Sequence, residues 1–302
     1  MSSPNTAFDA CSRLSVPLAF GTLSMREVFQ AAKRRQAGLY DLPPGRRGTW
    51  PGALRSFLAR LHWHCHFMQK LEDEPRIEFE SFHPAYDGLR VDDSERLERW
   101  AAGRTGLPFI DACMRALAHH GWINFRMRAM LVSFASYQLW LPWRGSGLHL
   151  ARLFTDYEPG IHWPQMQMQS ATTGINLPRI YNPIKQGRDF DPDGVFIQKW
   201  VPELAGVPAA FLHEPWTWDG AERELAGRYP APIVDERSAR RAAQEGIWAV
   251  RRKPRYREIA DAIQAKHGSR KSGIPQQEGR IAAARRQAQA GATRQLQLGL
   301  GE

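Results

Sequence analysis

One long segment, residues 156–183, constrains the fold of this chain more than any other. It reads DYEPGIHWPQMQMQSATTGINLPRIYNP, and four prolines and two glycines interrupt any helical or strand period. The segment is nevertheless too apolar for a solvated loop, because it contains Ile161, Trp163, Met166, Met168, Ile175 and Leu177. The polar backbone groups of such an irregular segment need partners. We therefore expect it to wrap against a large, mostly apolar ligand or to lie between helices.

Helical periodicity governs most of the remaining chain, and neither an internal repeat nor a convincing series of strands is visible in the sequence. Ser24 and Glu27 form a predicted capping box at the start of one helix. Residues 51–71 carry an apolar stripe at helical spacing, made of Leu54, Phe57, Leu58, Leu61, Cys65 and Met68. Further helices are predicted at residues 108–119, 122–140, 146–155, 193–204 and 235–252. These patterns predict an all-α fold.

The charge balance favours a polyanionic partner. The chain has a net charge of +10 and a pI near 9.9, which suits nucleic acid or an anionic membrane surface. No run of 18 apolar residues occurs, so no membrane span is expected, and the N-terminus has no secretion signal. The cysteines Cys11, Cys65 and Cys113 are widely separated, which argues against a disulfide framework. We expect a reduced, cytoplasmic protein.

The composition changes toward the C-terminus, and this change defines the predicted domain boundary. Residues 1–250 are predicted to form a helical domain. Residues 251–302 are predicted to be a basic extension that begins with a short helix and continues as a flexible tail. The last part, residues 264–302, holds seven Lys or Arg against two Glu, which is half of the net charge of the chain.

A second face of the helix at residues 51–71 is rich in aromatic and basic side chains. This face carries Arg60, Trp63, His64 and Phe67, which lie three or four residues apart except for the adjacent pair Trp63 and His64. An aromatic ring between a cation and a histidine suits a flat ligand. The alternative is that Trp63 packs against a neighbouring helix.

Three histidines in the same helix have a spacing that does not favour a metal site. Of His62, His64 and His66, only His62 and His66 share a helical face, and no carboxylate lies one turn away on that face. We interpret these side chains as solvated or hydrogen-bonded, and we predict no bound metal.

Arg126 and Arg128 lie among apolar residues in a predicted helix. Because they are two positions apart, their side chains cannot point the same way, and one is expected to face the interior or a cleft of the domain. A buried arginine needs a carboxylate partner. The candidates are Asp111, Asp156 and Glu158.

Several motifs in register resemble the helical FAD-binding domain of the photolyase/cryptochrome family. They are residues 11–15 (CSRLS), Trp63, residues 121–128 (GWINFRMR), residues 156–183, residues 194–197 (GVFI) and residues 200–204 (WVPEL). The resemblance covers residues 6–218, with a weaker match at residues 229–235. It implies an α-helical domain that holds FAD in a bent conformation beneath a positively charged surface that receives DNA.

The resemblance implies a phosphate-binding role for the first of these motifs. Ser12, Arg13, Leu14 and Ser15 match the family segment that holds the FAD phosphates. Hydroxyl groups and backbone N–H groups in a turn that leads into a helix are chemically suited to a pyrophosphate.

The resemblance also implies which residues lie beside the flavin ring. Arg128 matches the family arginine beside the isoalloxazine, and Asp156 matches its acidic partner. Glu158 corresponds to a second acid that contacts the flavin region, and His162 corresponds to the residue near flavin N5. Arg128, Asp156 and His162, together with Trp63, are the expected catalytic residues.

The lesion pocket implied by the resemblance departs from the family pattern. Trp63 matches an aromatic residue that stacks against a flipped lesion. Arg60 lies where DNA-repairing relatives carry a glutamate that contacts the lesion. Met168 lies where many members have a tryptophan that lines the pocket. Arg60, Trp63 and Met168 are therefore the predicted pocket residues.

The implied electron path departs in a similar way. Met166 lies where many members have the tryptophan that begins a path from the flavin to the surface. Trp143 matches the middle of that path, and no clear outer tryptophan occurs near Arg90. Trp140 and Trp163 are the alternative carriers.

The predicted function is FAD-dependent, blue-light-driven repair of pyrimidine dimers by a photolyase-like lyase, with damaged duplex or single-stranded DNA as the partner. The alternatives are a cryptochrome-like blue-light sensor and a DNA-binding flavoprotein without photochemistry. Family members normally begin with an α/β antenna domain, whereas Met1 here lies immediately before the flavin domain. We expect an antenna-free form, a separate α/β antenna-domain protein that partners this monomeric chain, or a truncated reading frame.

Overall fold

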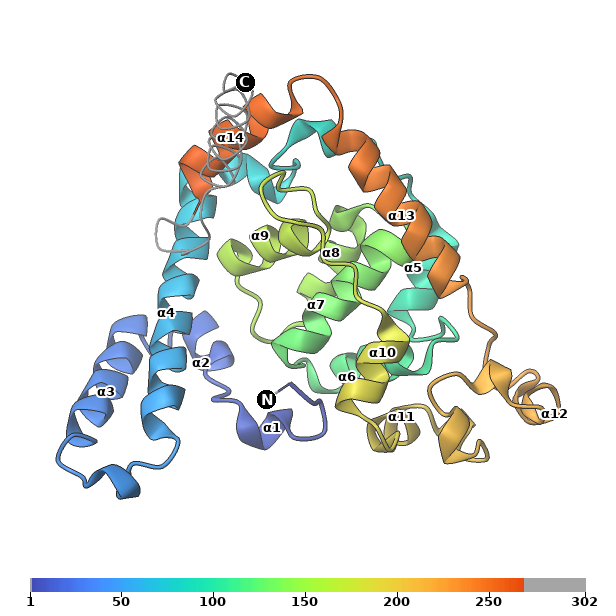
Figure 1. Ribbon diagram of the computed structural model, residues 1–302, viewed down its shortest axis with the longest axis horizontal. Helices are drawn as coiled ribbons and strands as arrows, with labels where there is room; N and C mark the ends of the chain where they lie inside the picture. The colour runs from blue at the N-terminus through green and yellow to red at the C-terminus, as the bar shows by residue number, and fades with distance from the viewer. Residues whose placement is uncertain (1, 269–302) are drawn as a thin grey trace, which may run out of the picture. The chain divides into compact units, whose positions relative to one another are not determined.

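The computed structural model describes residues 2–268, and this part of the chain consists of helices and connecting segments without a β-strand (Figure 1). The predicted all-α fold class is confirmed. In chain order the α-helices are α1 (Ala7–Ala10), α2 (Ser15–Ala19), α3 (Met25–Gly38), α4 (Trp50–Asp73), α5 (Ser94–Ala101), α6 (Pro108–His120), α7 (Phe125–Ser133), α8 (Trp143–Leu153), α9 (Pro159–Gln169), α10 (Pro183–Phe190), α11 (Val195–Trp200), α12 (Ala221–Leu225), α13 (Glu236–Arg251) and α14 (Tyr256–His267).

Short helical turns lie between these helices. They are η1 (Pro44–Arg46), η2 (Pro75–Glu78), η3 (Pro84–Tyr86), η4 (Phe134–Gln138), η5 (Pro202–Leu204), η6 (Ala209–Phe211) and η7 (Pro215–Thr217). Within residues 2–268, no helix combines the length and the apolar character that crossing a membrane requires.

The capping box predicted at the start of α3 is confirmed. The Ser24 hydroxyl accepts a hydrogen bond from the Glu27 backbone N–H at 3.2 Å, and the Glu27 carboxylate accepts one from the Ser24 backbone N–H at 2.8 Å. This exchange satisfies two backbone donors that the helix itself cannot pair. The helix then packs against the first half of α4 through a cluster that includes Val28, Ala32, Leu54, Leu58 and Leu61.

The buried face of α4 changes along its length, and this corrects the predicted stripe. Leu54, Leu58 and Leu61 are buried as expected. Cys65, which was predicted to continue the stripe, is exposed, whereas Phe67 from the other predicted face is buried. The physical reason is a change of partner, because the second half of α4 packs against α9 and η2 instead of α3.

The main core surrounds α6, α7 and α9. Its fully buried side chains include Trp100, Ile110, Leu117, Met127, Leu131 and Trp163. Gly121 ends α6 in the left-handed conformation at φ +65°, and a Cβ there would lie 2.4 Å from the Thr155 side chain. The chain can therefore turn into α7 and lie close to the segment before α9 only with glycine at this position.

The first part of the segment at residues 156–183 is a regular helix, which corrects the expectation of an irregular segment. α9 contains Pro164 in its interior and is buried on most sides. A helix buried on most sides has no polar face, so its sequence shows no alternation of apolar and polar residues at helical spacing. α9 approaches α4 closely, because a Cβ on Gly160 would lie 2.6 Å from the Met68 sulfur. The expected position between helices is thus confirmed, and within this segment only residues 156–158 and the residues between α9 and α10 are irregular.

The helix predicted at residues 122–140 is two elements. α7 ends at Ser133, and η4 continues it as a π-helical turn in which the Leu139 N–H donates to the Phe134 carbonyl at 3.0 Å. The wider turn leaves the Ser136 carbonyl to accept from Arg90 Nε at 2.7 Å. Burial lowers the pKa of Arg90 to about 10.

Other predicted boundaries shift by a few residues. The helix expected at residues 146–155 begins earlier, at Trp143. The helix expected at residues 193–204 is divided into α11 and η5, because Pro202 has no N–H to continue the α-helical hydrogen bonds. The helix expected at residues 235–252 is α13, and the Asp235 side chain caps it by accepting from the Ser238 N–H at 2.9 Å.

The C-terminal part of the described chain is α14, which corresponds to the short helix predicted after residue 250. It belongs to the compact unit Met1–His267. Glu74 at the end of α4 accepts hydrogen bonds from Lys266 Nζ at 2.8 Å and from His267 Nε2 at 2.5 Å. The flexible tail predicted beyond α14 lies outside the described residues.

Candidate functional site

Arg128 on α7 and Asp156 in the loop before α9 form a buried ion pair. Arg128 Nη1 lies 3.0 Å from Asp156 Oδ1, and Nη2 lies 2.9 Å from Oδ2. The side chain of Asp156 is 3% exposed and that of Arg128 is 21% exposed. Arg128 Nε donates to the Ile123 carbonyl at 2.7 Å. A guanidinium has five N–H groups and three are used here, so two remain available to a ligand.

Two of the other candidates for this pairing, Arg126 and Asp111, have contacts elsewhere. Arg126 points away from Asp156 and lies 5.3 Å from the ring centre of Phe190. Asp111 is buried and accepts hydrogen bonds from Thr105 and from the Tyr229 hydroxyl. The prediction that one of the two arginines faces inward and needs a carboxylate is confirmed, and Asp156 is that carboxylate.

His162 on α9 is held as a neutral ring close to this pair. Its Nε2 lies 3.0 Å from the Gly147 carbonyl oxygen, which can only accept, so Nε2 carries the proton and Nδ1 is a free acceptor. Burial lowers the pKa of His162 to about 4. The ring of Phe154 lies beside both His162 and Arg128: its centre is 6.0 Å from the centre of the His162 ring and 4.2 Å from the Arg128 guanidinium.

Glu158 positions His162 through its backbone. It precedes α9, and its carbonyl accepts from the N–H groups of Ile161 at 3.0 Å and His162 at 2.8 Å. Burial raises the pKa of the Glu158 carboxyl. The side chain is only partly exposed, so a second acid lies within one turn of His162.

Residues 12–14 connect α1 to α2 next to the same site, and Ser15 is the first residue of α2. The Arg13 guanidinium lies between the rings of Phe8 and Trp122, 4.4 Å from each centroid. Its Nε is buried and has no hydrogen-bond partner among the described residues. Ser15 Oγ accepts from Trp122 Nε1 at 3.3 Å. Because Trp122 precedes Ile123, whose carbonyl holds Arg128, this segment adjoins the Arg128 pair.

The exposed hydroxyls complete the chemistry of this segment. Ser12 and Ser15 are both exposed, and Leu14 is partly buried against the cluster of α3 and α4. Hydroxyls beside a guanidinium with an unused buried N–H are a donor set that suits phosphate oxygens. Their role in binding the FAD phosphates stays a prediction.

The predicted lesion-pocket residues lie on α4 and α9. The Trp63 side chain is 40% exposed, and its ring contacts His66 and Phe67 of its own helix at 5.4 and 5.9 Å. It is therefore not buried against a neighbouring helix. Arg60 lies one turn earlier and is exposed, and Met168 is partly buried. These side chains are available at the surface, and their contact with a lesion stays a prediction.

The histidines of α4 do not converge. His62 lies against the ring of Phe29 at 5.6 Å, whereas His66 lies against Trp63. Within residues 2–268, no three His, Cys, Asp or Glu side chains come close enough together to hold a metal ion.

Two of the three proposed electron carriers are in contact. The rings of Trp143 and Trp163 are 5.9 Å apart at 73°, and the Trp163 ring lies 4.7 Å from His162. Both tryptophans are buried. Trp140 instead lies under the Arg90 guanidinium at 4.8 Å and packs on Gly246 of α13. The structure thus joins Trp143 and Trp163 to the His162 site and places Trp140 elsewhere.

The residues present fit an FAD molecule by their chemistry. The paired Arg128 and Asp156 add no net charge to the site, and the neutral His162 adds none. An uncharged heteroaromatic ring could bind there without leaving a buried charge unpaired. Arg13 and the hydroxyls of Ser12 and Ser15 would suit the pyrophosphate.

Comparison with known proteins agrees with this chemistry. A family model described as "FAD binding domain of DNA photolyase" matches residues 57–249. The deoxyribodipyrimidine photo-lyase of Streptomyces griseus is 36% identical over 236 residues, which are 78% of this chain and 48% of that protein. Cryptochrome-2 of Arabidopsis thaliana is 32% identical over 80% of this chain and 40% of its own length.

A solved structure shows the same fold. The bacterial class III photolyase from Agrobacterium tumefaciens superimposes with a TM-score of 0.72 at 29% identity, over 83% of this chain and 52% of that chain. The chain therefore belongs to the family of FAD-binding domains of DNA photolyases and cryptochromes. It is a flavoprotein whose cofactor is FAD, and it spans about half the length of the curated relatives that it matches.

Parts of the site are not visible in the sequence alone. The rings of Phe154 and Tyr157 pack beside His162 in the structure. In the sequence, only their closeness to Asp156 could have indicated that they belong to the site. A separate large cleft lies between α10, α13 and η7, away from Arg128. Its lining comes from four distant stretches of sequence, so no motif marks it.

Proposed function

We propose that this domain supports FAD-dependent, blue-light-driven repair of pyrimidine dimers in DNA. The observation that carries the proposal is the buried pair of Arg128 and Asp156 next to a neutral His162, in a chain of the FAD-binding photolyase family. Relatives that bear the name deoxyribodipyrimidine photo-lyase support it.

The Arg128 pair would bind and orient the flavin ring. The two N–H groups of Arg128 that remain unused can donate to ring oxygen or nitrogen atoms, while Asp156 keeps the guanidinium fixed by its bidentate contact. The chemistry that FAD supplies when bound is a light-driven electron for the dimer, which returns after the dimer splits. A fixed guanidinium also stabilises negative charge on a neighbouring ring without reorganisation.

His162 would control a proton at the same site. Because its Nδ1 is a free acceptor and its pKa is about 4, the side chain can accept a hydrogen bond from a ring N–H while staying neutral. A protonated histidine would add a second buried cation beside Arg128, and burial prevents this.

The exposed face of α4 would receive the DNA. Trp63 offers a ring on which a flipped base can stack, and Arg60 offers a cation one turn away. The net charge of +10 favours binding to phosphates that weakens with salt. α4 packs directly on α9, which carries His162, so the helix that would receive the base also borders the flavin site.

A cryptochrome-like light sensor is the second candidate. Arg60 is exposed at the position where a repair enzyme of the family is expected to carry a glutamate, and Cryptochrome-2 is among the relatives. A cation there would pair with phosphate rather than interact with a dimer as a carboxyl group does. A DNA-binding flavoprotein without photochemistry is the remaining alternative.

We also propose partners, an oligomeric state and a location for the protein. Damaged duplex or single-stranded DNA is the proposed partner, with a separate α/β antenna-domain protein as a further one. A cytoplasmic location is proposed because the three cysteines of the sequence are widely separated, which argues against a disulfide framework. A monomeric state is proposed with it.

The test compares light and dark repair by the purified FAD-bound protein. The protein is reduced anaerobically, mixed with ultraviolet-irradiated oligothymidylate, and exposed to blue light, and the loss of dimers is measured. We expect repair only in the light, and Trp63→Ala is expected to weaken binding of the damaged strand at least tenfold. Trp248→Ala, which removes another exposed tryptophan on α13, is the matched control.

The outcomes separate the candidates. Light-dependent change in the flavin absorption without loss of dimers would support the sensor and reject repair. DNA binding by a protein whose bound flavin does not respond to light would support the third alternative.

A further inference from the structure

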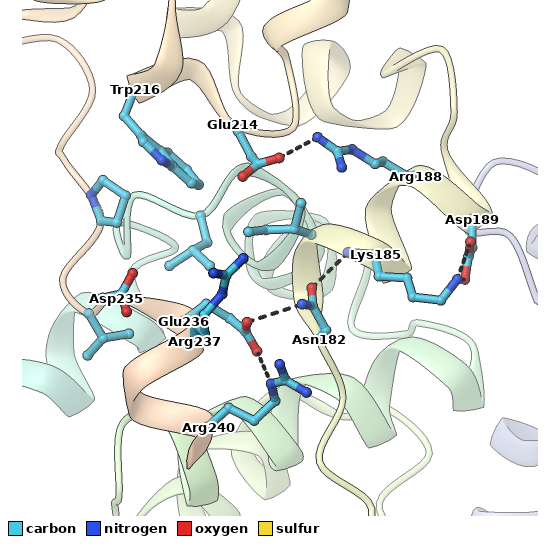
Figure 2. Close-up of a pocket in the computed structure, with 14 residues that line it drawn as sticks. Asn182, Lys185, Arg188, Asp189, Glu214, Trp216, Asp235, Glu236, Arg237 and Arg240 are labelled. Atoms are coloured by element: carbon cyan, nitrogen blue, oxygen red, sulfur yellow. Dashed lines mark hydrogen bonds and ion pairs between the residues drawn. The ribbon is translucent and has the colours of Figure 1, made fainter. Parts of the chain in front are cut away.

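A cleft of about 980 Å³ lies between the N-terminal ends of α10 and α13 and the turn η7 (Figure 2). This volume is at the upper end of the range found for small-molecule sites. Its apolar wall is made of Leu107, Ile184, Trp216, Pro232 and Val234. Its charged side chains are Lys185, Arg188, Asp189, Glu214, Asp235, Glu236, Arg237 and Arg240.

Most of these charges are paired within the cleft. Lys185 Nζ lies 2.9 Å from Asp189, and Arg188 forms an ion pair with Glu214. Asp235 is occupied as the cap of α13. The groups that remain available to a ligand are therefore Glu236, Arg237 and the ring of Trp216.

Glu236 is a buried carboxylate with acceptor capacity left over. Its side chain is 8% exposed. Oε2 accepts from Asn182 Nδ2 at 3.1 Å, whereas Oε1 has two long contacts of 3.4 Å, with Gln138 Nε2 and Arg240 Nε. A carboxylate can accept about four hydrogen bonds, and buried acceptors are normally satisfied at shorter distances. Glu236 can therefore accept N–H groups from a ligand in addition to these contacts.

Arg237 is an exposed cation of the cleft, and its charge acts on the neighbouring carboxylates Asp235 and Glu236 without a direct contact. Among residues 2–268 it forms neither a hydrogen bond nor an ion pair, although it follows Glu236 directly. Figure 2 shows Arg237 and Trp216 directed into the same space, from α13 and from η7. Trp216 is 36% exposed, so its ring is available to a ligand. A free guanidinium suits phosphate, and an exposed indole suits a flat ring.

From these three groups we propose that the cleft binds a mononucleotide whose base carries an amino group, with guanine the best fit. The base stacks on Trp216 and donates its N–H groups to Glu236, while the phosphate pairs with Arg237. Carboxylates accept from the amino groups of bases in nucleic-acid recognition in the same way. Guanine presents two adjacent kinds of N–H donor, and thymine has no exocyclic amino group.

The site is separate from the flavin site. None of the cleft residues belongs to the Arg128 and His162 cluster, and α13 contributes the two residues that would bind the base and the phosphate. The nucleotide could be a free molecule or the terminal nucleotide of a strand. The chemistry is the same, and length distinguishes them.

The test is calorimetric titration of the FAD-loaded protein with deoxyguanosine monophosphate. We expect saturable binding with a Kd below about 1 mM, and at least tenfold weaker binding of thymidine monophosphate. Arg237→Gln is expected to weaken binding of the monophosphate at least tenfold and to leave binding of deoxyguanosine, which lacks the phosphate, unchanged. Arg241→Gln is the matched control, because Arg241 is on α13 but pairs with Glu245 and does not line the cleft.

Further variants keep the result decisive if one of them folds poorly. Trp216→Ala is expected to lose binding tenfold or more, and Trp216→Phe to keep most of it. Glu236→Gln is expected to remove the preference for guanine over thymine. A short strand with a 5′-terminal guanylate that binds more tightly than the monophosphate would identify the strand as the source of the nucleotide.

Two results would overturn the proposal. One is no saturable binding of any of these nucleotides up to several millimolar. The other is binding at a different site. This would be shown if Arg237→Gln and Trp216→Ala left the binding unchanged, or if binding occurred only in protein without FAD, which would place the nucleotide in the flavin site.

Discussion

Gly160 of α9 lies directly against Met68 of α4, so that a Cβ at position 160 would be 2.6 Å from the Met68 sulfur and 3.0 Å from its Cα. A side chain at position 160 would therefore require the Met68 side chain to move and its backbone to give by a few tenths of an ångström. The same contact brings the helix that carries Trp63 against the helix that carries His162. Close packing of α4 on α9 is thus a condition for the whole candidate site.

Gly160→Ala is expected to push α4 away from α9. Because the obstruction includes backbone and not only a side-chain tip, we expect a loss of about 1–3 kcal/mol in the free energy of unfolding. The FAD content of the purified protein, measured by the ratio of flavin to protein absorbance, should fall as well. Gly52→Ala on α4 is the control, since nothing lies within 4 Å of that position. Equal stability of the two variants would contradict the packing argument.

Asp156→Asn is expected to destabilise the protein by about 3 kcal/mol. The change leaves the guanidinium of Arg128 without the carboxylate that neutralises it, and a buried charge that has lost its partner is costly. Urea denaturation measures the effect. Glu245→Gln breaks an exposed pair with Arg241 and should cost less than about 1 kcal/mol. The idea fails if both substitutions have the same small effect.

His162 gives the protein a defined dependence on pH. Burial lowers its pKa from 6.5 to about 4 in the folded state, so the unfolded chain binds the proton more readily. Its contribution to stability is complete above about pH 6.5 and is lost as the pH falls toward 4. We expect His162→Asn to reduce the loss of stability between pH 7 and pH 5 by about 2 kcal/mol. Denaturant midpoints of both proteins at the two pH values provide the comparison, and parallel profiles would disprove the assignment.

Glu74 is expected to hold α14 on the end of α4. Burial opposes its charge, but hydrogen bonds from Lys266 and His267 and the charge of Arg76 outweigh this and lower its pKa to about 2. This stabilisation, about 1–2 kcal/mol, is present above pH 4.5 and is lost as the pH falls toward 2.

Glu74→Gln should therefore open α14 locally without unfolding the rest of the domain. Hydrogen exchange at the amides of α14 is expected to accelerate about 5- to 30-fold, while α7 stays protected. Glu258→Gln, which removes an exposed pair between α14 and Arg255 just before it, is the control. Uniform acceleration across the protein would show that Glu74 acts on global stability instead.

Trp163→Phe is expected to slow light-driven reduction of bound FAD by at least tenfold in the presence of a thiol reductant. The reason is its position between His162, at 4.7 Å, and Trp143, at 5.9 Å. In the Trp140→Phe variant the bound FAD should be reduced at nearly the wild-type rate, because Trp140 packs on α13 and on Arg90. Absorption changes under blue light measure both rates. A slower Trp140→Phe variant beside an unaffected Trp163→Phe variant would reverse the assignment.

Local rules predicted the parts of the fold that depend on neighbours in sequence. The Ser24–Glu27 capping box and the glycine that ends α6 need only a few adjacent residues, so both were predictable. The period of α4 was right in its first half. It was wrong at Cys65 and Phe67, because the choice of buried face there depends on α9, which lies almost a hundred positions away.

The helix α9 was missed for a physical reason. A helix that is buried on most sides has no polar face, so the apolar period that reveals a surface helix is absent, and Pro164 adds a misleading break. The residue pattern alone narrowed the partner of the inward arginine to three acids, the family resemblance singled out Arg128 and Asp156, and the fold shows their contact. The cleft of Glu236 and Arg237 could not be predicted, because it depends on the meeting of four loops and helix ends.

The π-helical turn η4 adjusts the rotational phase of the chain. Each residue of an α-helix turns the chain by about 100°, so a segment one residue shorter would present every later side chain in a different direction. The extra residue of the turn sets the directions of the groups at the end of this helix, including the Ser136 carbonyl that accepts from Arg90 Nε at 2.7 Å. Length, as much as identity, is therefore under constraint at Phe134–Gln138: a conservative substitution there is a local event, whereas a single deletion would rotate the end of the helix and displace the carbonyl that Arg90 uses.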